Sequence, residues 1–395
     1  MTTAQRYDIT DFISTRAIAS RAGGRERLLA KAEGRTDVIR LGRGDPDLPT
    51  PRHIIEAAKR ALDTGATHYT SWQGRGDLRE AIADKCRRDY GVPASADQVI
   101  VTAGGQEAVY ATFQALLNDG DEVLLADPHY NSYSRAVRLA GGVPVFVPCD
   151  EQHAFALDPA AVEARITKRT KILAVITPNN PTGAVIPEAA VRALAELAIR
   201  HNLLVIADDI YERFVFGDTP HVSAAAVPQI ADRVIIINGL SKTYAMTGWR
   251  LGYLVPPRAL VPALEVLTHT MTICAPAVSQ AAGVAALTGP QDSVREMRDI
   301  FADRRKVLLA GFEELGLGGG WSQGGHFLFP NITSTHLSSE EFCERLMEET
   351  GVMMFPGTAF GAGEGYLRVS FLQPIDAIRT AVERIGPAVR RLQRA

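Results

Sequence analysis

The chain has 395 residues, of which 46% are hydrophobic and 22% are charged, and its formal net charge is -3. These values are typical of a soluble globular protein with one or two domains, and they give no electrostatic reason to expect nucleic-acid or membrane binding. The four cysteines and nine histidines lack metal-ligand spacing, so we expect reduced thiols and no metal site. The N-terminus has no apolar signal core and no apolar run could span a bilayer, which favours the cytoplasm.

The first hundred or so residues contain helices and polar loops rather than strands. Residues 16–32 have the periodicity of a helix broken at Gly23-Gly24, and a short strand from Val38 leads into a loop rich in glycine and proline. Amphipathic helices are predicted at residues 51–64 and 77–90. A polar, aromatic loop that contains Tyr69 connects them.

From residue 99 onwards, short apolar strands alternate with helices. The strands are predicted at residues 99–102, 123–126, 144–147, 171–177, 203–208, 234–237 and 251–255, with helices at 108–117, 132–139 and 188–201. Continuously apolar strands are typical of a parallel sheet covered on both faces. We therefore predict an α/β fold with a mainly parallel, seven-stranded sheet and helices on both faces.

The rest of the chain has a different pattern. A long helix is predicted at residues 258–287 and another at 291–315, followed by short strands at 326–329, 352–355 and 367–371 mixed with helices. This pattern predicts a smaller α+β domain. The expected division is an N-terminal arm with part of the small domain (1–50), a large domain (51–290) and a small domain (291–395).

Polar residues follow the predicted strand ends, where open α/β sheets bind ligands. Gly104-Gly105-Gln106 can begin a helix whose amides hold a phosphate, although an ordinary tight turn is the alternative. Tyr130 can stack on a planar ring or simply pack in its loop. Asn180 can donate a hydrogen bond to a phenolate-like oxygen or belong to a plain turn.

One loop carries the most specific chemistry. Lys242 follows an apolar strand, where an amine loses its proton readily and can attack a carbonyl. Its neighbours Ser241 and Arg250 can hold a phosphate. A reactive lysine next to a phosphate site indicates an aldehyde cofactor that carries a phosphate, which is pyridoxal phosphate. Asp208 ends another apolar strand and needs a cationic partner, such as a protonated ring nitrogen, unless it caps a helix or forms a salt bridge. Arg368 lies in an apolar strand, where its guanidinium needs a carboxylate partner. That carboxylate can belong to a ligand or to an internal ion pair.

Three motifs have an order and a spacing that together match those of a known protein family. They are Asn180-Pro-Thr-Gly183, Asp208-Asp-Ile-Tyr211 and Ser241-Lys-Thr-Tyr-Ala-Met-Thr-Gly-Trp-Arg250. Further matches are Gly44-Asp-Pro-Asp47, Pro356-Gly-Thr-Ala-Phe-Gly361 and Leu367-Arg-Val369. On these motifs the chain resembles the fold-type I pyridoxal-phosphate-dependent aminotransferases of class I and II, the aspartate aminotransferase superfamily. The resemblance extends from about residue 38 to about residue 371.

The resemblance implies an enzyme that uses pyridoxal 5'-phosphate to move the amino group of an L-amino acid to a 2-oxo acid with ping-pong kinetics. The catalytic residues would be Lys242, which links to the cofactor aldehyde, Asp208 at the ring nitrogen and Tyr211, with Asn180, at the ring oxygen. Tyr130 would stack on the ring. The phosphate would be held by Gly105, Gln106, Ser241 and Arg250, and by Tyr69 of a neighbouring subunit in a homodimer. The substrate would be held by Arg368, Asn180 and the Gly44 backbone.

The sequence departs from the family pattern at a few positions. Gly239 stands where some relatives have a phosphate-binding serine, Gln106 stands where many have lysine, and Asp209 replaces a frequent glutamate. Arg43, Trp72, Arg75 and His326 are less usual and fall in loops expected to line the substrate pocket. Arg43 or Arg75 would suit a second carboxylate, whereas Trp72, Phe360 and His326 would suit an aromatic or neutral side chain; a purely structural role is the alternative for either set.

Other functions remain compatible with the same scaffold. They are a lyase acting at the β or γ carbon, including the C–S β-lyase type, and a cyclopropane-forming synthase. A non-catalytic regulator that binds the cofactor is less well supported, because the segment before Val38 is too short for a DNA-binding module. A nicotinamide dehydrogenase would explain the α/β pattern, but the glycine fingerprint of dinucleotide binding is absent from the sequence.

Overall fold

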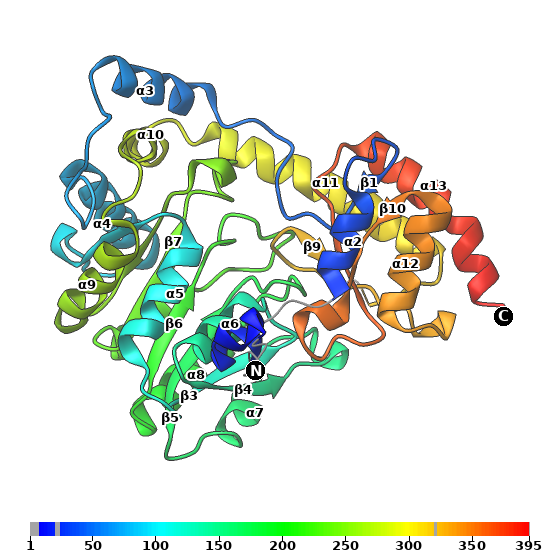
Figure 1. The fold of residues 1–395 in the computed structure, drawn as a ribbon, viewed down its shortest axis with the longest axis horizontal. Coiled ribbons are helices and arrows are strands. Elements are labelled where there is room, and N and C mark those ends of the chain that lie inside the picture. The colour runs from blue at the N-terminus through cyan, green and yellow to red at the C-terminus, as the bar shows by residue number, and fades with distance from the viewer. Residues whose placement is uncertain (1–7, 20–23, 320–321, 395) are drawn as a thin grey trace, which may run out of the picture.

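The structure, a computed structural model, describes residues 8–19, 24–319 and 322–394. Its centre is a seven-stranded sheet with the strand order β2-β8-β7-β6-β5-β3-β4 (Figure 1). The strands are β2 (Ile100–Thr102), β3 (Glu122–Asp127), β4 (Val143–Pro148), β5 (Thr170–Ile176), β6 (Leu204–Asp208), β7 (Val234–Gly239) and β8 (Gly252–Val255). Strand β8 is antiparallel to β2 and β7, and the pairs from β7 to β4 are parallel. The predicted mainly parallel sheet is confirmed.

Helices cover both faces of this sheet because its strands are apolar on both sides. In β5, Leu173 and Val175 pack on one face, whereas Ile172 and Ala174 pack on the other. The first face is covered by α3 (Arg52–Asp63), α4 (Gly76–Tyr90), α8 (Glu188–Arg200) and α10 (Ala277–Thr288). The second is covered by α5 (Gly105–Leu116), α6 (Ser132–Leu139) and α9 (Val261–Thr272), and the short α7 (Pro159–Glu163) packs beside α8.

One predicted helix is wrong in its extent. Residues 258–287 form two helices, α9 and α10, instead of one. The chain leaves the helical conformation at Ile273, which has a φ of 65°, and α10 begins only after Pro276. Proline has no backbone N–H and restricts the residue before it, so Pro276 favours the start of a new helix over the continuation of α9.

The chain after residue 290 forms a smaller α+β portion, to the right in Figure 1. A three-stranded antiparallel sheet has the order β11-β12-β9. Its strands are β9 (Phe327–Leu328), β11 (Phe355–Pro356) and β12 (Leu367–Ser370), and its helices are α11 (Asp292–Glu314), α12 (Ser339–Thr350) and α13 (Ile375–Leu392). A separate parallel pair joins β1 (Ile39–Arg40) to β10 (Val352–Met353), so the N-terminal part of the chain completes this portion.

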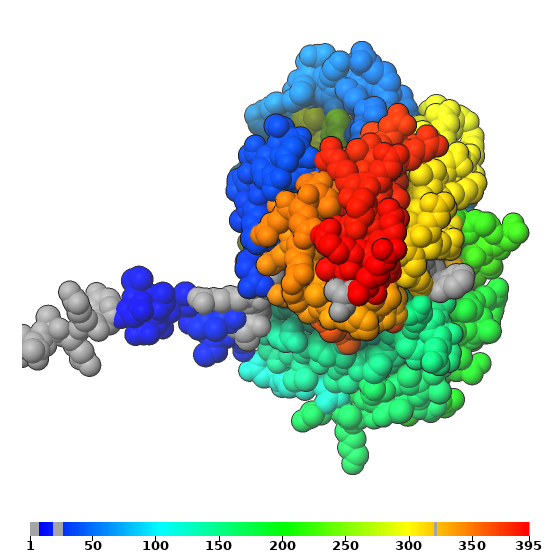
Figure 2. Space-filling view, turned by 90° about the vertical axis from the view of Figure 1, so that its right-hand side faces the viewer, coloured from blue at the N-terminus to red at the C-terminus, as the bar shows by residue number. Residues whose placement is uncertain are grey.

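The N-terminal segment contacts both portions of the molecule. Helix α2 (Gly24–Ala32) packs on β11, whereas α1 (Thr15–Ala19) packs on α6, and Arg16 of α1 forms an ion pair with Asp119 in the loop between α5 and β3. Figure 2 shows the dark blue N-terminal residues projecting away from the rest of the molecule. The predicted break at Gly23-Gly24 falls in part outside the described residues. No helix among the described residues is both long and apolar enough to cross a membrane.

Candidate active site

A cavity of about 420 Å³ lies at the carboxyl ends of β5, β6 and β7, beneath residues of β9, β11 and β12. It brings together almost all the site residues predicted from the sequence: Gly44, Gly105, Gln106, Tyr130, Asn180, Asp208, Tyr211, Ser241, Lys242, Arg250 and Arg368. The exception is Tyr69, whose side chain lies outside the cavity and is 78% exposed. Other lining residues could not be predicted from the sequence, among them Leu29, Asp45, Tyr133, Phe327 and Phe355.

Lys242 projects into this cavity from the loop after β7. Its Nζ donates a hydrogen bond of 2.5 Å to the carbonyl oxygen of Gly44. The pKa of Lys242 is lowered to about 8, chiefly by burial; the charge of Asp45 raises it, and the charges of Arg368 and Arg250 lower it. An amine with a pKa near neutrality is partly uncharged under ordinary conditions, so Lys242 can act as a nucleophile and as a base.

Asp208 lies at the end of β6, buried on the cavity floor. Its carboxylate accepts hydrogen bonds of 2.5 Å from the Tyr133 hydroxyl and 3.1 Å from the Ile210 amide. Among the described residues no cation forms an ion pair with it, and burial raises its pKa to about 6. The segment after Asp208 is a turn, so Asp208 is not the cap of a following helix. A protonated ring nitrogen would supply the positive partner that this carboxylate lacks.

The start of α5 and Arg250 form the end of the cavity that suits a phosphate. Helix α5 begins at Gly105, so its free amides face the cavity together with Ser241. Gly104 has a φ of 91°, and a Cβ there would stand 2.4 Å from Nη2 of Arg250. Only glycine therefore allows the Arg250 guanidinium to pass over the turn, where it donates hydrogen bonds to the carbonyls of Thr247 and Ala103.

Arg368 and Asn180 form the opposite end. The Arg368 guanidinium donates hydrogen bonds of 3.1 Å to Oδ1 of Asn180 and 2.7 Å to the carbonyl of Gly42. It lies 4.1 Å from the ring centre of Phe327 and 4.3 Å from that of Phe360. Hydrogen bonds and cation–π contacts therefore fix a buried guanidinium in the orientation that a carboxylate ligand needs.

The residues expected to set substrate preference do not all reach the cavity. Arg43 lines it and forms no hydrogen bond or ion pair with the described residues. Arg75 instead forms a two-point ion pair with Asp77, at 2.6 and 3.0 Å. Trp72 is 52% exposed and packs edge-on against His269.

His326 and Phe360 are also absent from the cavity wall. His326 is fully buried behind Tyr211, with ring centres 5.0 Å apart, and burial lowers its pKa. Phe360 is fully buried against Arg368. Trp72, Arg75, His326 and Phe360 therefore do not line the cavity of this single chain.

The arrangement fits pyridoxal phosphate. The cavity presents a reactive lysine, a buried carboxylate without a cation, and two donors, Asn180 and Tyr211, near the same floor. Helix amides, Ser241 and Arg250 complete the phosphate end. The lysine suits the aldehyde of that cofactor, and the carboxylate suits its ring nitrogen. The two donors suit its ring oxygen, and the amides, Ser241 and Arg250 suit its phosphate.

Comparison with known proteins gives a consistent result. The sequence profile of the family described as aminotransferase class I and II matches residues 36–385. The chain is 39% identical over 362 residues to an aspartate aminotransferase of Geobacillus stearothermophilus, covering 90% of this chain and 92% of that protein. It is also 39% identical over 362 residues to an arginine–pyruvate transaminase of Pseudomonas aeruginosa, covering 91% and 92%. A solved structure of a Thermus thermophilus aspartate aminotransferase single mutant superimposes with a TM-score of 0.91 at 37% identity, covering 95% and 99%.

Proposed function

The chain belongs to the class I and II aminotransferase family, and on that premise we propose how its cavity residues divide the work. The protein is a pyridoxal-phosphate-dependent transaminase that moves an amino group from an L-amino acid to a 2-oxo acid. The observation that carries the assignment of roles is the convergence of Lys242, Asp208, Arg250 and Arg368 on one cavity.

Each residue has a task that follows from its place. When bound, the cofactor supplies an aldehyde and an electron-withdrawing ring that stabilises negative charge at the substrate α carbon. Lys242 would hold the cofactor through its aldehyde group, and its amine, when free, is placed to accept and return a proton as a general base. Asp208 keeps the ring nitrogen protonated, because a buried carboxylate favours a positive partner. Tyr211 and Asn180 donate to the ring oxygen, and Tyr130 stacks on the ring.

The two ends of the cavity fix the orientation of the ligands. The Gly105 and Gln106 amides, Ser241 and Arg250 hold the phosphate. Arg368, with Asn180 and the Gly44 backbone, holds the α-carboxylate of the substrate, since a planar guanidinium binds a carboxylate at two points.

We also propose a homodimer, with Tyr69 reaching the phosphate of the second subunit. The exposed ring of Tyr69, away from the cavity of its own chain, supports this arrangement. The separate hydrophobic cores on the sheet and around β9, β11 and β12 support a division into a large domain (51–290) and a small domain (291–395) with the N-terminal arm (1–50). We place the enzyme in the cytoplasm, which agrees with its reduced cysteines.

The amino donor that we propose is a dicarboxylic acid, aspartate or glutamate. Arg43 lines the cavity without a partner among the described residues and can bind a second carboxylate, whereas Arg75 is already paired with Asp77. The Geobacillus relative is an aspartate aminotransferase, which supports the same choice.

A panel of amino donors tests this proposal, with 2-oxoglutarate, oxaloacetate and pyruvate as acceptors. We expect kcat/KM for aspartate or glutamate to exceed that for alanine and phenylalanine by about tenfold or more, the effect of one charged hydrogen bond of about 1.5–3 kcal/mol. Arg43→Ala should remove most of this preference without a similar loss for alanine. A wild-type preference for phenylalanine, or an unchanged preference in Arg43→Ala, would contradict the proposed substrate.

A further inference from the structure

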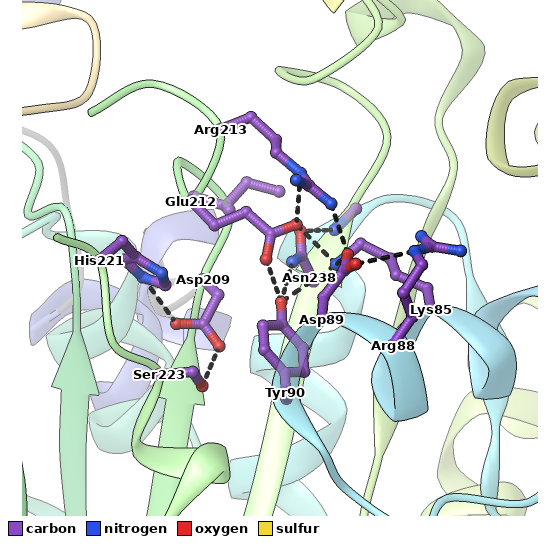
Figure 3. Close-up of polar contacts among 12 residues, drawn as sticks. Lys85, Arg88, Asp89, Tyr90, Asp209, Glu212, Arg213, His221, Ser223 and Asn238 are labelled. Atoms are coloured by element: carbon purple, nitrogen blue, oxygen red, sulfur yellow. Dashed lines mark hydrogen bonds and ion pairs between the residues drawn. The ribbon is translucent and has the colours of Figure 1, made fainter. Parts of the chain in front are cut away.

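The turn from Asp208 to Arg213 has a front and a back. Asp208 and Tyr211 face the cavity, whereas Asp209, Glu212 and Arg213 are absent from its lining. Asp209 and Glu212 bind charged or polar partners in the interior, and the partly exposed Arg213 pairs with Asp89 (Figure 3). Front and back residues are neighbours within six positions of the chain, so any shift of the back residues would also move Asp208 and Tyr211.

Glu212 is the centre of the cluster behind the turn. Its carboxylate lies 2.6 Å from Nζ of Lys85, and the side chains of both residues are at least nine-tenths buried (Figure 3). The Tyr90 hydroxyl donates a hydrogen bond to the other carboxylate oxygen of Glu212. Asp89 lies 3.3 Å from Lys85 and also pairs with Arg213. Lys85, Asp89 and Tyr90 all belong to the last turns of α4, so the cluster fastens the turn to that helix.

The same cluster also contacts the strand that leads to Lys242. Nδ2 of Asn238 donates a hydrogen bond of 3.1 Å to the Tyr90 hydroxyl oxygen. Oδ1 of Asn238 accepts one of 2.7 Å from the amide of Gly239, at the end of β7. Tyr90 therefore connects the Asp208 turn with the loop that carries Lys242.

A second set of contacts holds the other end of the turn. Asp209 is fully buried, and its carboxylate accepts a hydrogen bond of 2.6 Å from the Ser223 hydroxyl and lies 3.3 Å from Nε2 of His221. The amide of Asp209 donates to the carbonyl of Ile237 in β7. Both ends of the turn are thus fixed from behind, and its front face is left to the ligand.

The charges in the cluster stay ionised. Burial alone would favour neutral Glu212, but attraction from Lys85 and Arg213 outweighs it and lowers the pKa of Glu212. Burial likewise disfavours the charge on Lys85, but Glu212 and Asp89 outweigh it and raise the pKa of Lys85. A buried ion pair contributes little net stability compared with apolar packing, yet it fixes geometry strongly because either charge alone would be left without a partner.

We propose that Glu212, held by Lys85 and Tyr90, is a positioning residue for the transamination: it fixes the turn that presents Asp208 and Tyr211 to the cofactor. The inference rests on the proposed roles of Asp208 and Tyr211. Glu212 touches neither substrate nor cofactor, and it acts through its effect on these two residues. Misplacement of a catalytic group by about 1 Å can lower a rate by about 100-fold. Loss of the Glu212 contacts should therefore lower the rate of the chemical step.

The test compares two buried carboxylates. Glu212→Gln removes the charge at the cluster and keeps the side-chain volume. Glu122→Gln does the same to a buried carboxylate at the start of β3, the opposite end of the sheet, which lies 2.7 Å from Arg169. The readouts are the melting temperature, the dissociation constant of pyridoxal phosphate, the visible circular dichroism of the bound cofactor, and kcat and KM separately.

Both variants should lower the melting temperature, but only Glu212→Gln should affect the site. For Glu212→Gln we expect kcat to fall by about 10- to 100-fold with a smaller change in KM, the cofactor dissociation constant to rise about tenfold, and the dichroism to change. A Glu212→Gln enzyme that only loses melting temperature, as Glu122→Gln does, overturns the proposal.

Two further variants keep the outcome decisive. If Glu212→Gln does not fold, Tyr90→Phe, which removes the hydroxyl shared by Glu212 and Asn238, should cause the same changes to a smaller extent; unchanged kcat and dichroism there overturn the proposal. Asp208→Asn is measured in parallel. If Asp208→Asn is impaired while Glu212→Gln is not, only the positioning role fails, whereas a normal Asp208→Asn enzyme refutes the proposed role of Asp208 and the inference with it.

Discussion

Replacing Lys242 with alanine is expected to abolish the covalent attachment of the cofactor and to lower turnover by about 10⁴-fold, the upper range for loss of a general base. Burial lowers the pKa of Lys242 to about 8, so about half of its amines are uncharged at pH 8. A solvated lysine would have well under about 1% of its amines uncharged at that pH. The cavity therefore lowers the pKa of this amine, and no other lysine among the described residues lines it.

The measurement is mass spectrometry of the borohydride-reduced protein together with steady-state rates. In the wild type, the cofactor mass should be found on the peptide that contains Lys242, and it should be absent from Lys242→Ala. Lys242→Arg should be equally inactive, because it keeps a positive charge but has no nucleophilic amine. Lys171→Ala is a matched control: Lys171 lies at the start of β5 and pairs with Asp121 outside the cavity, so turnover should persist. Attachment to a different lysine would contradict the assignment.

Asp208→Asn is expected to keep the cofactor but to lower kcat by about 100-fold or more, the usual scale for loss of an electrostatic stabiliser. The amide preserves the shape of the side chain and can still accept the hydrogen bond from Tyr133. It carries no negative charge, so it cannot hold a proton on the ring nitrogen. Comparison of kcat and cofactor affinity for the wild type and the variant tests this role, and a rate within a few-fold of wild type would refute it.

The same variant should stabilise the protein when the cofactor is removed. Burial raises the pKa of Asp208 from 3.8 to about 6, so the folded chain binds this proton more tightly than the unfolded chain. The favourable contribution of Asp208 is present below its unfolded pKa and is lost as the pH rises through about 6. At pH 8 the ionised side chain disfavours folding by about 3 kcal/mol.

We therefore expect the cofactor-free Asp208→Asn protein to melt at a higher temperature than the cofactor-free wild type at pH 8. The difference should shrink at pH 5, where Asp208 of the wild type is mostly protonated. An equal difference at both pH values would contradict the link between the ionisation of Asp208 and its instability. Loss of stability at a site that gains function from its charge is a common compromise in enzymes.

Much of this site could be predicted because strand ends are visible in a sequence. Asp208 and Lys242 each follow an apolar strand, and parallel strands place their carboxyl ends at one edge, so both were expected at the same rim. The direction of β8 could not be predicted in this way, since an apolar run of four residues looks the same in either direction.

The parts that were missed depend on contacts between distant segments. Tyr133 donates a hydrogen bond to Asp208 across 75 positions of the chain, and Glu212 meets Lys85 across an even longer separation. His326 follows Gly324-Gly325 and precedes a strand, which suggested a loop at the pocket, yet it is buried behind Tyr211 among aromatic rings. Neither residue type nor spacing reveals such contacts, because they depend on how segments far apart in the sequence pack together in the folded chain.

A single half-reaction tests the central claim most directly, namely that this cavity carries out amino transfer. Cofactor-loaded enzyme is mixed with one amino acid donor and no acceptor, and the 2-oxo acid, ammonia and bound cofactor are quantified. The account predicts about one 2-oxo acid per subunit, no ammonia, and conversion of the bound aldehyde to its amine form, which a 2-oxo acid then reverses. Continuous release of ammonia, or formation of a ring product, would show lyase or synthase chemistry and would contradict it.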